Sequence, residues 1–79
     1  MDIQNLIKMA NQIGGYFSSY QDPQEASKEI ATHLERFWAP SMRMQLIDHV
    51  DYNHGEGLKD VVISSIKLHR DRLAPSRQR

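Results

Sequence analysis

The sequence predicts an all-α protein: a small single-domain bundle of three to four short helices. Apolar residues recur three and four positions apart in four segments of the 79-residue chain, which is the spacing of one helix face. Prolines stand where two of these segments begin. The run Val-Val-Ile at residues 61–63 is β-branched, but no second strand-like run exists for it to pair with. A chain this short buries only about 60% of its unfolded surface, so we expect a thin core.

The first predicted helix covers residues 3–18 or 3–20 and begins after Asp2, whose carboxylate suits the N-cap position. Its apolar face is formed by Ile3, Leu6, Ile7, Ala10, Ile13, Phe17 and Tyr20. Gly14 and Gly15 interrupt this face, although each costs a helix interior about 1 kcal/mol relative to alanine. Either they end the helix early or a neighbouring element packs closely there, and we expect close packing because the apolar pattern continues beyond them. A phosphate-binding loop is a further alternative, but the glycine spacing and the Lys-Ser/Thr of such loops are missing.

The second helix starts with a clear set of capping residues. Asp22 suits the N-cap, Pro23 the first helical position and Glu25 the capping-box position. The apolar face of this helix is Ala26, Ile30, Ala31, Leu34, Phe37 and Trp38. Pro40 begins a third helix in the same way. The apolar face of the third helix is Met42, Leu46, Ile47 and Val50. Only one or two residues separate the second and third helices, so the two meet at a corner around Ala39.

The rest of the chain predicts one loop, one helix and a tail. Residues 51–57 are rich in loop formers, and Gly55 or Gly57 suits the C-cap of the third helix. The fourth predicted helix covers residues 58–73. Its apolar face is Leu58, Val61, Val62, Ser65, Ile66, His69 and Leu73. Residues 74–79, APSRQR, are predicted to be a flexible basic tail, so the helical domain covers residues 1–73.

Charge and hydropathy argue against several classes of function. Ten basic and ten acidic side chains give a formal net charge of zero, which argues against attraction to nucleic acid or to a membrane surface. Basic residues are in excess near the end of the chain, where a solvated helix end is the first interpretation and a docking tail for an acidic partner the second. No apolar run approaches the roughly 20 residues that span a bilayer, and the N-terminal residues lack a signal-peptide core. We therefore expect a soluble, cytoplasmic protein.

The chain offers little for catalysis or for metal and cofactor binding. It contains no cysteine, which removes disulfides, thiolate metal sites and iron–sulfur ligation. His49 and His54 lie close to Asp48 and Asp51, but their spacing matches no specific metal-ligand pattern, and we interpret them as structural. No nucleophile with a base and no pair of carboxylates is recognisable. We predict no catalytic residue, no metal site and no cofactor site in this chain, and expect that it is not an enzyme.

The corner between the second and third helices, HLERFWAPSMRMQL at residues 33–46, contains the only tryptophan and two of the four methionines. Phe37, Trp38 and Met42 could fill the protein's own core, the usual fate of aromatic residues at helical spacing. Exposed Met, Trp, Pro and Arg are, however, typical of protein interfaces, and Arg43 lies between methionines on different sides of the third helix. We expect part of this cluster to face a partner or a second copy of the chain. His33 either orients the corner or faces the partner.

Three motifs of the chain match one protein family. They are Met-Ala-Asn-Gln-Ile at residues 9–13, His-Leu-x-x-Phe-Trp-x-Pro-x-Met-Arg at residues 33–43, and Gly-Leu at residues 57–58. In their order and spacing, over about two-thirds of the chain, they resemble the delta subunit of NAD-dependent, molybdenum-containing formate dehydrogenase. Ser41 departs from the family, in which this position is often basic. The departure puts in doubt a role for a second positive charge beside Arg43.

The resemblance implies a short helical accessory subunit that carries out no reaction itself. Other subunits of such a complex transfer electrons from formate to NAD with bis-molybdopterin guanine dinucleotide, iron–sulfur clusters and FMN. The delta subunit would bind the catalytic (alpha) subunit and support its assembly or stability. The alternative is a transient chaperone for insertion of the molybdenum cofactor, absent from the mature enzyme. The expected partner-binding residues are His33, Phe37, Trp38, Pro40, Met42 and Arg43 at the corner, and Met9, Asn11 and Gln12 in the first helix.

Overall fold

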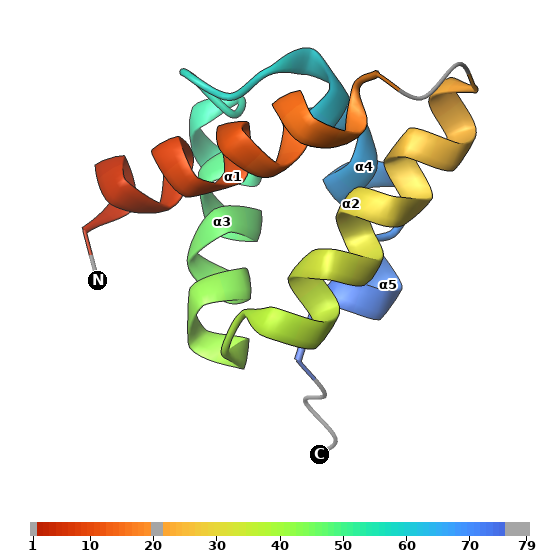
Figure 1. Cartoon of the computed structure of the whole chain (residues 1–79). Helices are drawn as coiled ribbons and strands as arrows, with labels where there is room; N and C mark the ends of the chain where they lie inside the picture. Colours follow the sequence, from red (N-terminus) through yellow and green to blue (C-terminus); the bar gives the residue numbers. More distant parts are fainter. Residues whose placement is uncertain (1, 20–21, 76–79) are drawn as a thin grey trace.

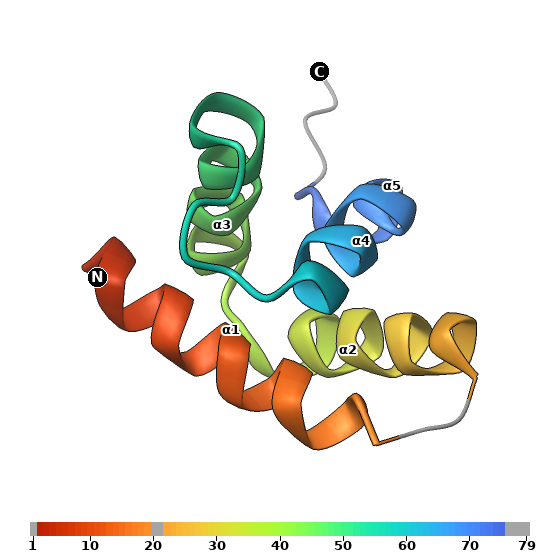
Figure 2. The same cartoon turned by 90° about the horizontal axis from the view of Figure 1, so that it is seen from above.

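The computed structural model describes residues 2–19 and 22–75, which form five helices in two layers. The helices are α1 (Ile3–Phe17), α2 (Pro23–Phe37), α3 (Pro40–Asn53), α4 (Asp60–Leu68) and α5 (Arg70–Leu73). α1 and α2 form one layer, and α3, α4 and α5 form the other (Figure 1, Figure 2). The all-α prediction is confirmed, and α5 is only a single turn. Within the described residues, no helix is both long enough and apolar enough to span a bilayer.

The helix starts follow the capping signals of the sequence. The carboxylate of Asp2 accepts a hydrogen bond from the backbone N–H of Gln4 at 3.2 Å and caps α1. The carboxylate of Asp22 accepts one from Gln24 at 3.0 Å, with Pro23 at the first helical position of α2. Because α3 also begins with a proline, directly after a two-residue link, the predicted corner between α2 and α3 is present.

The core lies between the two layers and is formed by aliphatic side chains from all five helices. Its most deeply buried members include Leu6, Ile30, Leu34, Leu46, Ile47, Val62, Ile66 and Leu73. Small side chains lie where α2 meets α4, and there the hydroxyl of Ser65 donates to the backbone carbonyl of Ser27 at 2.7 Å. Removing this apolar surface from water is the main stabilising term for so small a chain.

The glycine pair of α1 is explained by the approach of α4. A Cβ atom on Gly14 would lie 2.5 Å from Cγ2 of Val62, closer than real Cβ atoms come. A Cβ atom on Gly15 would meet only the side chain of Lys59, at 3.9 Å. The close packing that the sequence predicted therefore occurs at Gly14, while Gly15 is exposed.

The loop between α3 and α4 differs from the prediction, because α3 continues to Asn53. His54 has a left-handed backbone (φ 59°), and Gly55 follows with φ 69°. The expectation that a glycine ends α3 is wrong by one residue. The cap is closed by the N–H of Gly55, which donates to the carbonyl of His49 at 3.2 Å. The ring of His49 also contacts the carbonyl of Glu56 at 2.7 Å and holds the loop.

The predicted helix over residues 58–73 starts later and is divided in two. Leu58 is buried but belongs to the loop, and α4 begins only after Lys59. At His69 the backbone leaves the helical conformation (φ −111°, ψ 28°), and α5 follows as a separate turn. The apolar spacing continues across His69 to the buried Leu73, so periodicity alone does not reveal the break. Of the predicted tail, only Ala74 and Pro75 are described, and residues 76–79 lie outside the described residues.

Candidate functional site

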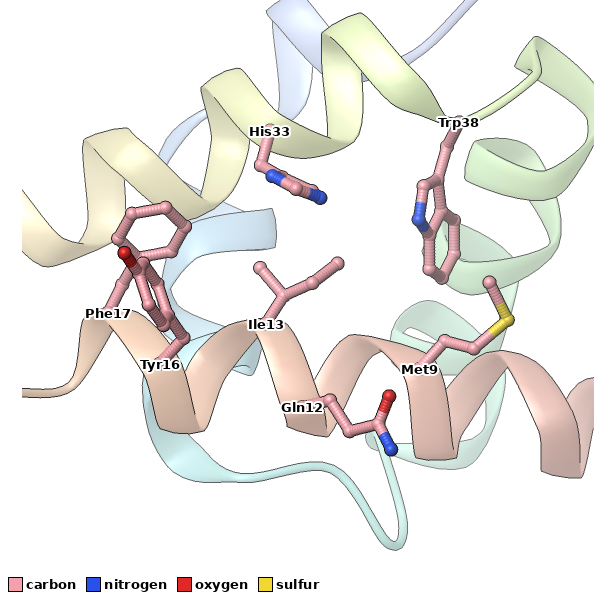
Figure 3. Close-up of a pocket in the computed structure, with 7 residues that line it drawn as sticks. All are labelled: Met9, Gln12, Ile13, Tyr16, Phe17, His33 and Trp38. Carbon is pink, nitrogen blue, oxygen red and sulfur yellow. The ribbon is translucent and has the colours of Figure 1, made fainter.

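An apolar groove lies between α1 and α2 on the surface of the molecule (Figure 3). It has a volume of about 450 Å³ and is lined by Met9, Gln12, Ile13, Tyr16, Phe17, His33 and Trp38. Ile13 lies at its centre, with Met9 toward one end and Phe17 toward the other (Figure 3). None of the lining residues is Lys, Arg, Asp or Glu. The groove therefore presents to a ligand an aromatic and aliphatic surface that carries no formal charge.

A row of aromatic rings runs along this groove. Tyr16 and Phe17 pack edge to face, with ring centroids 4.9 Å apart. The ring of His33 lies 6.2 Å from that of Phe17 and 4.8 Å from that of Phe37. These separations fall within the range in which aromatic rings attract one another. The row joins α1 to α2 and ends at Phe37, the last residue of α2.

Two aromatic side chains of this row are largely exposed. Phe37 is 70% exposed and Tyr16 is 72% exposed. The sequence placed Phe37 on the apolar face of the second helix, and this part of the prediction is wrong. Because α2 ends at this residue, its ring lies beyond the core and beside His33. Large exposed aromatic side chains next to an apolar groove are typical of binding surfaces.

Trp38 belongs both to the core and to the groove. Its side chain is only 5% exposed and packs in the hydrophobic core, while its ring closes one end of the groove (Figure 3). The extended backbone at this residue (φ −99°, ψ 136°) ends α2 and allows the ring to turn inward. Within the described residues, the indole N–H has no hydrogen-bond partner, and it points toward the interior of the groove (Figure 3).

Arg43, expected at the contact surface, is bonded inside the protein. Its Nε donates to the carbonyl of Leu73 at 3.0 Å. Its Nη1 donates to the carbonyls of Glu35 and Trp38 at 3.0 and 3.2 Å. Carbonyls in the last turn of a helix lack intrahelical partners and carry partial negative charge. Arg43 therefore ties α3 to the C-terminal ends of α2 and α5, an arrangement that we call the Arg43 clamp.

Asn11 forms a second internal connection, between α1 and the loop before α4. Its Nδ2 donates to the carbonyl of Gly57 at 2.9 Å. Its Oδ1 accepts from the backbone N–H of Lys59 at 2.8 Å, directly before α4 begins. The amide thus uses both its donor and its acceptor to hold the loop, and we call this arrangement the Asn11 clamp. It brings the Met-Ala-Asn-Gln-Ile motif together with the Gly-Leu motif.

The structure joins the two patches that the sequence suggested separately. Four expected residues line the groove: Met9, Gln12, His33 and Trp38. Phe37 adjoins it, Pro40 is exposed at the corner and Met42 packs partly against the core.

The groove residues that sequence reasoning did not select for a site are Ile13, Tyr16 and Phe17. Their signal was the spacing from Met9, at four, seven and eight positions, which places them along one side of α1. Contact of any of these residues with a partner stays a prediction.

Two ion pairs lie away from the groove and link α5 to its neighbours. Arg72 bonds Glu35 at 2.8 Å, and this hydrogen bond lowers the pKa of the carboxyl group. Arg70 bonds Asp51, which lowers the pKa of Asp51 and raises that of Arg70. Both pairs are accessible to solvent, which screens them, so each contributes only modestly to holding α5 in place.

The groove does not fit the cofactors that the resemblance associates with formate dehydrogenase. FMN, NAD and molybdopterin guanine dinucleotide carry phosphate groups, which proteins bind with Lys, Arg or clustered backbone N–H groups. The groove lining contains no Lys or Arg. Within residues 2–19 and 22–75, no three His, Cys, Asp or Glu side chains come together as a metal site. An apolar surface of another protein suits this lining better than any of these groups.

Comparison with protein families gives a match over most of the chain. The family model "NADH-dependent formate dehydrogenase delta subunit FdsD" covers residues 5–66, more than three quarters of the chain. This region includes the whole groove, both residues of the clamps and most of α4, and ends before α5. Searches of curated proteins and of solved structures returned no match.

Proposed function

The chain belongs to the delta subunit family of NADH-dependent formate dehydrogenases, and from this membership we propose that it is a non-catalytic accessory subunit. It binds the catalytic (alpha) subunit in the cytoplasm and supports assembly or stability of the complex. The groove between α1 and α2 is the contact surface. Electron transfer from formate to NAD takes place in the other subunits, with their bis-molybdopterin guanine dinucleotide, iron–sulfur clusters and FMN.

The observation that carries this proposal is the uncharged groove flanked by the exposed rings of Tyr16 and Phe37. A small chain with a thin core gains little by leaving such rings in water, whereas binding to a larger subunit would bury them. Buried aromatic side chains near the centre of an interface contribute much of the binding free energy. The absence of cysteine and the uncharged lining support the placement of the redox cofactors in the other subunits.

The test is affinity purification of the tagged chain from cells that express the whole formate dehydrogenase complex. Phe37→Ser should reduce recovery of the catalytic subunit by about tenfold or more, because it removes an exposed aromatic anchor. Leu68→Ser is the matched control, because this residue is 64% exposed and does not line the groove. Equal recovery with both variants would show that the groove is not the contact surface. Absence of the catalytic subunit from the wild-type preparation would contradict the accessory role itself.

The same purification separates a resident subunit from a transient chaperone. A resident subunit is recovered with active, cofactor-loaded enzyme at equal stoichiometry. A chaperone for cofactor insertion is recovered only with catalytic subunit that lacks its molybdenum cofactor. We propose the resident subunit, because an exposed apolar surface on so small a chain favours a permanent partner.

A further inference from the structure

We infer that the groove binds one amphipathic helix of the partner subunit, and that this helix runs parallel to α2, with its N-terminus near Glu29 and its C-terminus near Arg36 and Trp38. The inference rests on the proposed function. It adds the type of secondary structure, the residue pattern and the chain direction of the partner element.

The occupant is a helix because the groove offers only side chains. The backbone N–H and C=O groups of α1 and α2 are used within their own helices, so the groove has no edge that could pair with a strand. A strand or loop placed there would bury unpaired backbone groups against Met9, Ile13 and the aromatic rings. A helix satisfies its backbone internally and presents a ridge of side chains, which fits the channel between two neighbouring helices.

The length of the groove sets the pattern of the partner helix. Its lining on α1 extends from Met9 to Phe17, which at 1.5 Å per residue corresponds to about 12 Å. This is slightly more than two helical turns. A partner helix therefore places apolar side chains at i, i+3 or i+4, and i+7 in the groove. Because the lining has no formal charge, this stripe is uncharged.

Two charges on the edge of α2 give the partner helix a direction. Glu29 lies four residues before His33 and Arg36 three residues after it, so helical spacing places both on the groove edge of α2. The salt bridges of the described residues are Arg70 with Asp51 and Arg72 with Glu35, so neither Glu29 nor Arg36 is paired. Seven positions separate them, or about 10.5 Å along the helix.

This charge pattern complements the dipole of a helix parallel to α2. A helix N-terminus carries partial positive charge and suits the end of the groove at Glu29. A helix C-terminus carries partial negative charge and four carbonyls without partners, and it suits the end at Arg36. The free indole N–H of Trp38 lies at that same end and can donate to one of these carbonyls (Figure 3).

Photo-crosslinking in the co-expressed complex tests both the site and the direction. The crosslinker benzoyl-phenylalanine replaces either Tyr16, which lines one end of the groove, or Phe37, which adjoins the groove beside His33 and directly precedes Trp38 at the other end; both residues are exposed. Tyr52 is the control position, because it is 78% exposed and does not line this groove. We expect positions 16 and 37 to link to one helix of the partner, with the attachment from position 37 about two turns closer to its C-terminus. Position 52 should not link to this helix.

Several outcomes would overturn the inference. Links from positions 16 and 37 to a second copy of this chain would show self-association instead. Links in the reverse order would show the opposite direction, and links to a non-helical segment would exclude a helix. In each of these cases the chain is still recovered with the complex. If the wild-type chain is not recovered with the complex at all, the proposed function fails as well, so the two failures are distinguishable.

Charge reversal tests the direction independently. The double variant Glu29→Lys with Arg36→Glu keeps the net charge and inverts the two ends of the groove edge. We expect about fivefold weaker binding of the catalytic subunit, because the interaction with both helix ends becomes repulsive. The matched control is Glu56→Lys with Lys67→Glu, which inverts two exposed charges away from the groove. Equal binding of the two double variants and the wild type would contradict the inferred direction.

Discussion

The clamps and the groove use neighbouring residues of the same motifs in opposite ways. On the clamp side, Asn11 and Arg43 direct their polar groups to backbone atoms of the chain itself. On the groove side, Met9 and Gln12, from the same motif as Asn11, line a surface open to solvent. His33, ten residues before Arg43, lies in the row of rings. Residues that carry the family resemblance thus divide into those that hold the fold and those that remain available to a partner.

This difference shows how hydrogen bonding separates the two roles. An amide or guanidinium group whose donors are bonded within the chain has little left to offer a partner, and removing it leaves backbone carbonyls of the chain without these donors. Removing an exposed ring such as that of Phe37 changes the stability of the isolated fold little. Motif matching gives both kinds of residue equal weight. Variants of the clamps should therefore lower the stability of the isolated chain most, whereas variants of the groove should weaken binding in the complex most.

The largest expected contrast is between two adjacent residues, Trp38 and Phe37. Trp38→Ala removes a large side chain that is 5% exposed, and should lower the free energy of unfolding by about 3–5 kcal/mol. Phe37→Ala removes a ring that is 70% exposed, and should change the free energy of unfolding by no more than about 0.5 kcal/mol. Urea unfolding of the isolated chain, followed by circular dichroism, measures both. A comparable loss in Phe37→Ala would mean that this ring is part of the core.

The Arg43 clamp should give the next largest effect. Arg43→Met keeps an apolar stem but removes all three hydrogen bonds to carbonyls, and should cost about 2–3 kcal/mol of stability. Arg43→Lys should lie between this variant and the wild type, because an ammonium group cannot reproduce the planar fork. Amide hydrogen exchange should show faster opening of α5, which the clamp holds through Leu73. A fully stable Arg43→Met variant that loses the catalytic subunit would instead place Arg43 at the interface.

The parts of the fold that the sequence predicted are those set by local interactions. The starts of α1 and α2 follow from Asp2 and from Asp22-Pro23, which act within three residues along the chain. The clamps were not predicted, because Asn11 and Lys59 are 48 positions apart and periodicity carries no information on such pairs. For the same reason the sequence predicted two separate patches and not the groove that contains residues of both. Their union depends on how α1 packs against α2.

The two adjacent glycines of α1 should respond to the same substitution with opposite sign. Gly14→Ala places a methyl group against the buried Val62 and should destabilise the chain by about 1–2 kcal/mol, after the gain in helix propensity is included. Gly15→Ala meets only a flexible lysine side chain at 3.9 Å and should stabilise by about 0.5–1 kcal/mol. Thermal unfolding of the pair gives the signs directly. Stabilisation by both substitutions would mean that α1 and α4 do not pack as closely as described.

His69, at the break between α4 and α5, makes the stability of the fold depend on pH. Its Nε2 is buried without a hydrogen-bond partner among the described residues, and burial lowers the pKa of its ring below 6.5, with Arg72 and Lys28 adding to the effect. Below 6.5 the unfolded chain takes up a proton that the folded chain does not, so stability falls as the pH drops toward the lowered pKa. The pKa values of Glu35 and Asp51 are lowered from their ordinary values of 4.5 and 3.8. The stability that these two carboxylates contribute is therefore lost only in more acidic solution, as the pH falls below those values.

His69→Leu isolates this contribution, because it removes the titrating ring and leaves an apolar side chain beside the core. The wild type should lose stability between about pH 7.5 and about pH 5, whereas the variant should lose less over the same interval. Urea unfolding at several pH values measures the difference, with Glu35→Gln as the control that changes only the more acidic part of the profile. An equal loss in wild type and His69→Leu would show that His69 does not cause the pH dependence. It would also mean that the burial of His69 Nε2 at the junction of α4 and α5 does not make the stability of the fold depend on pH.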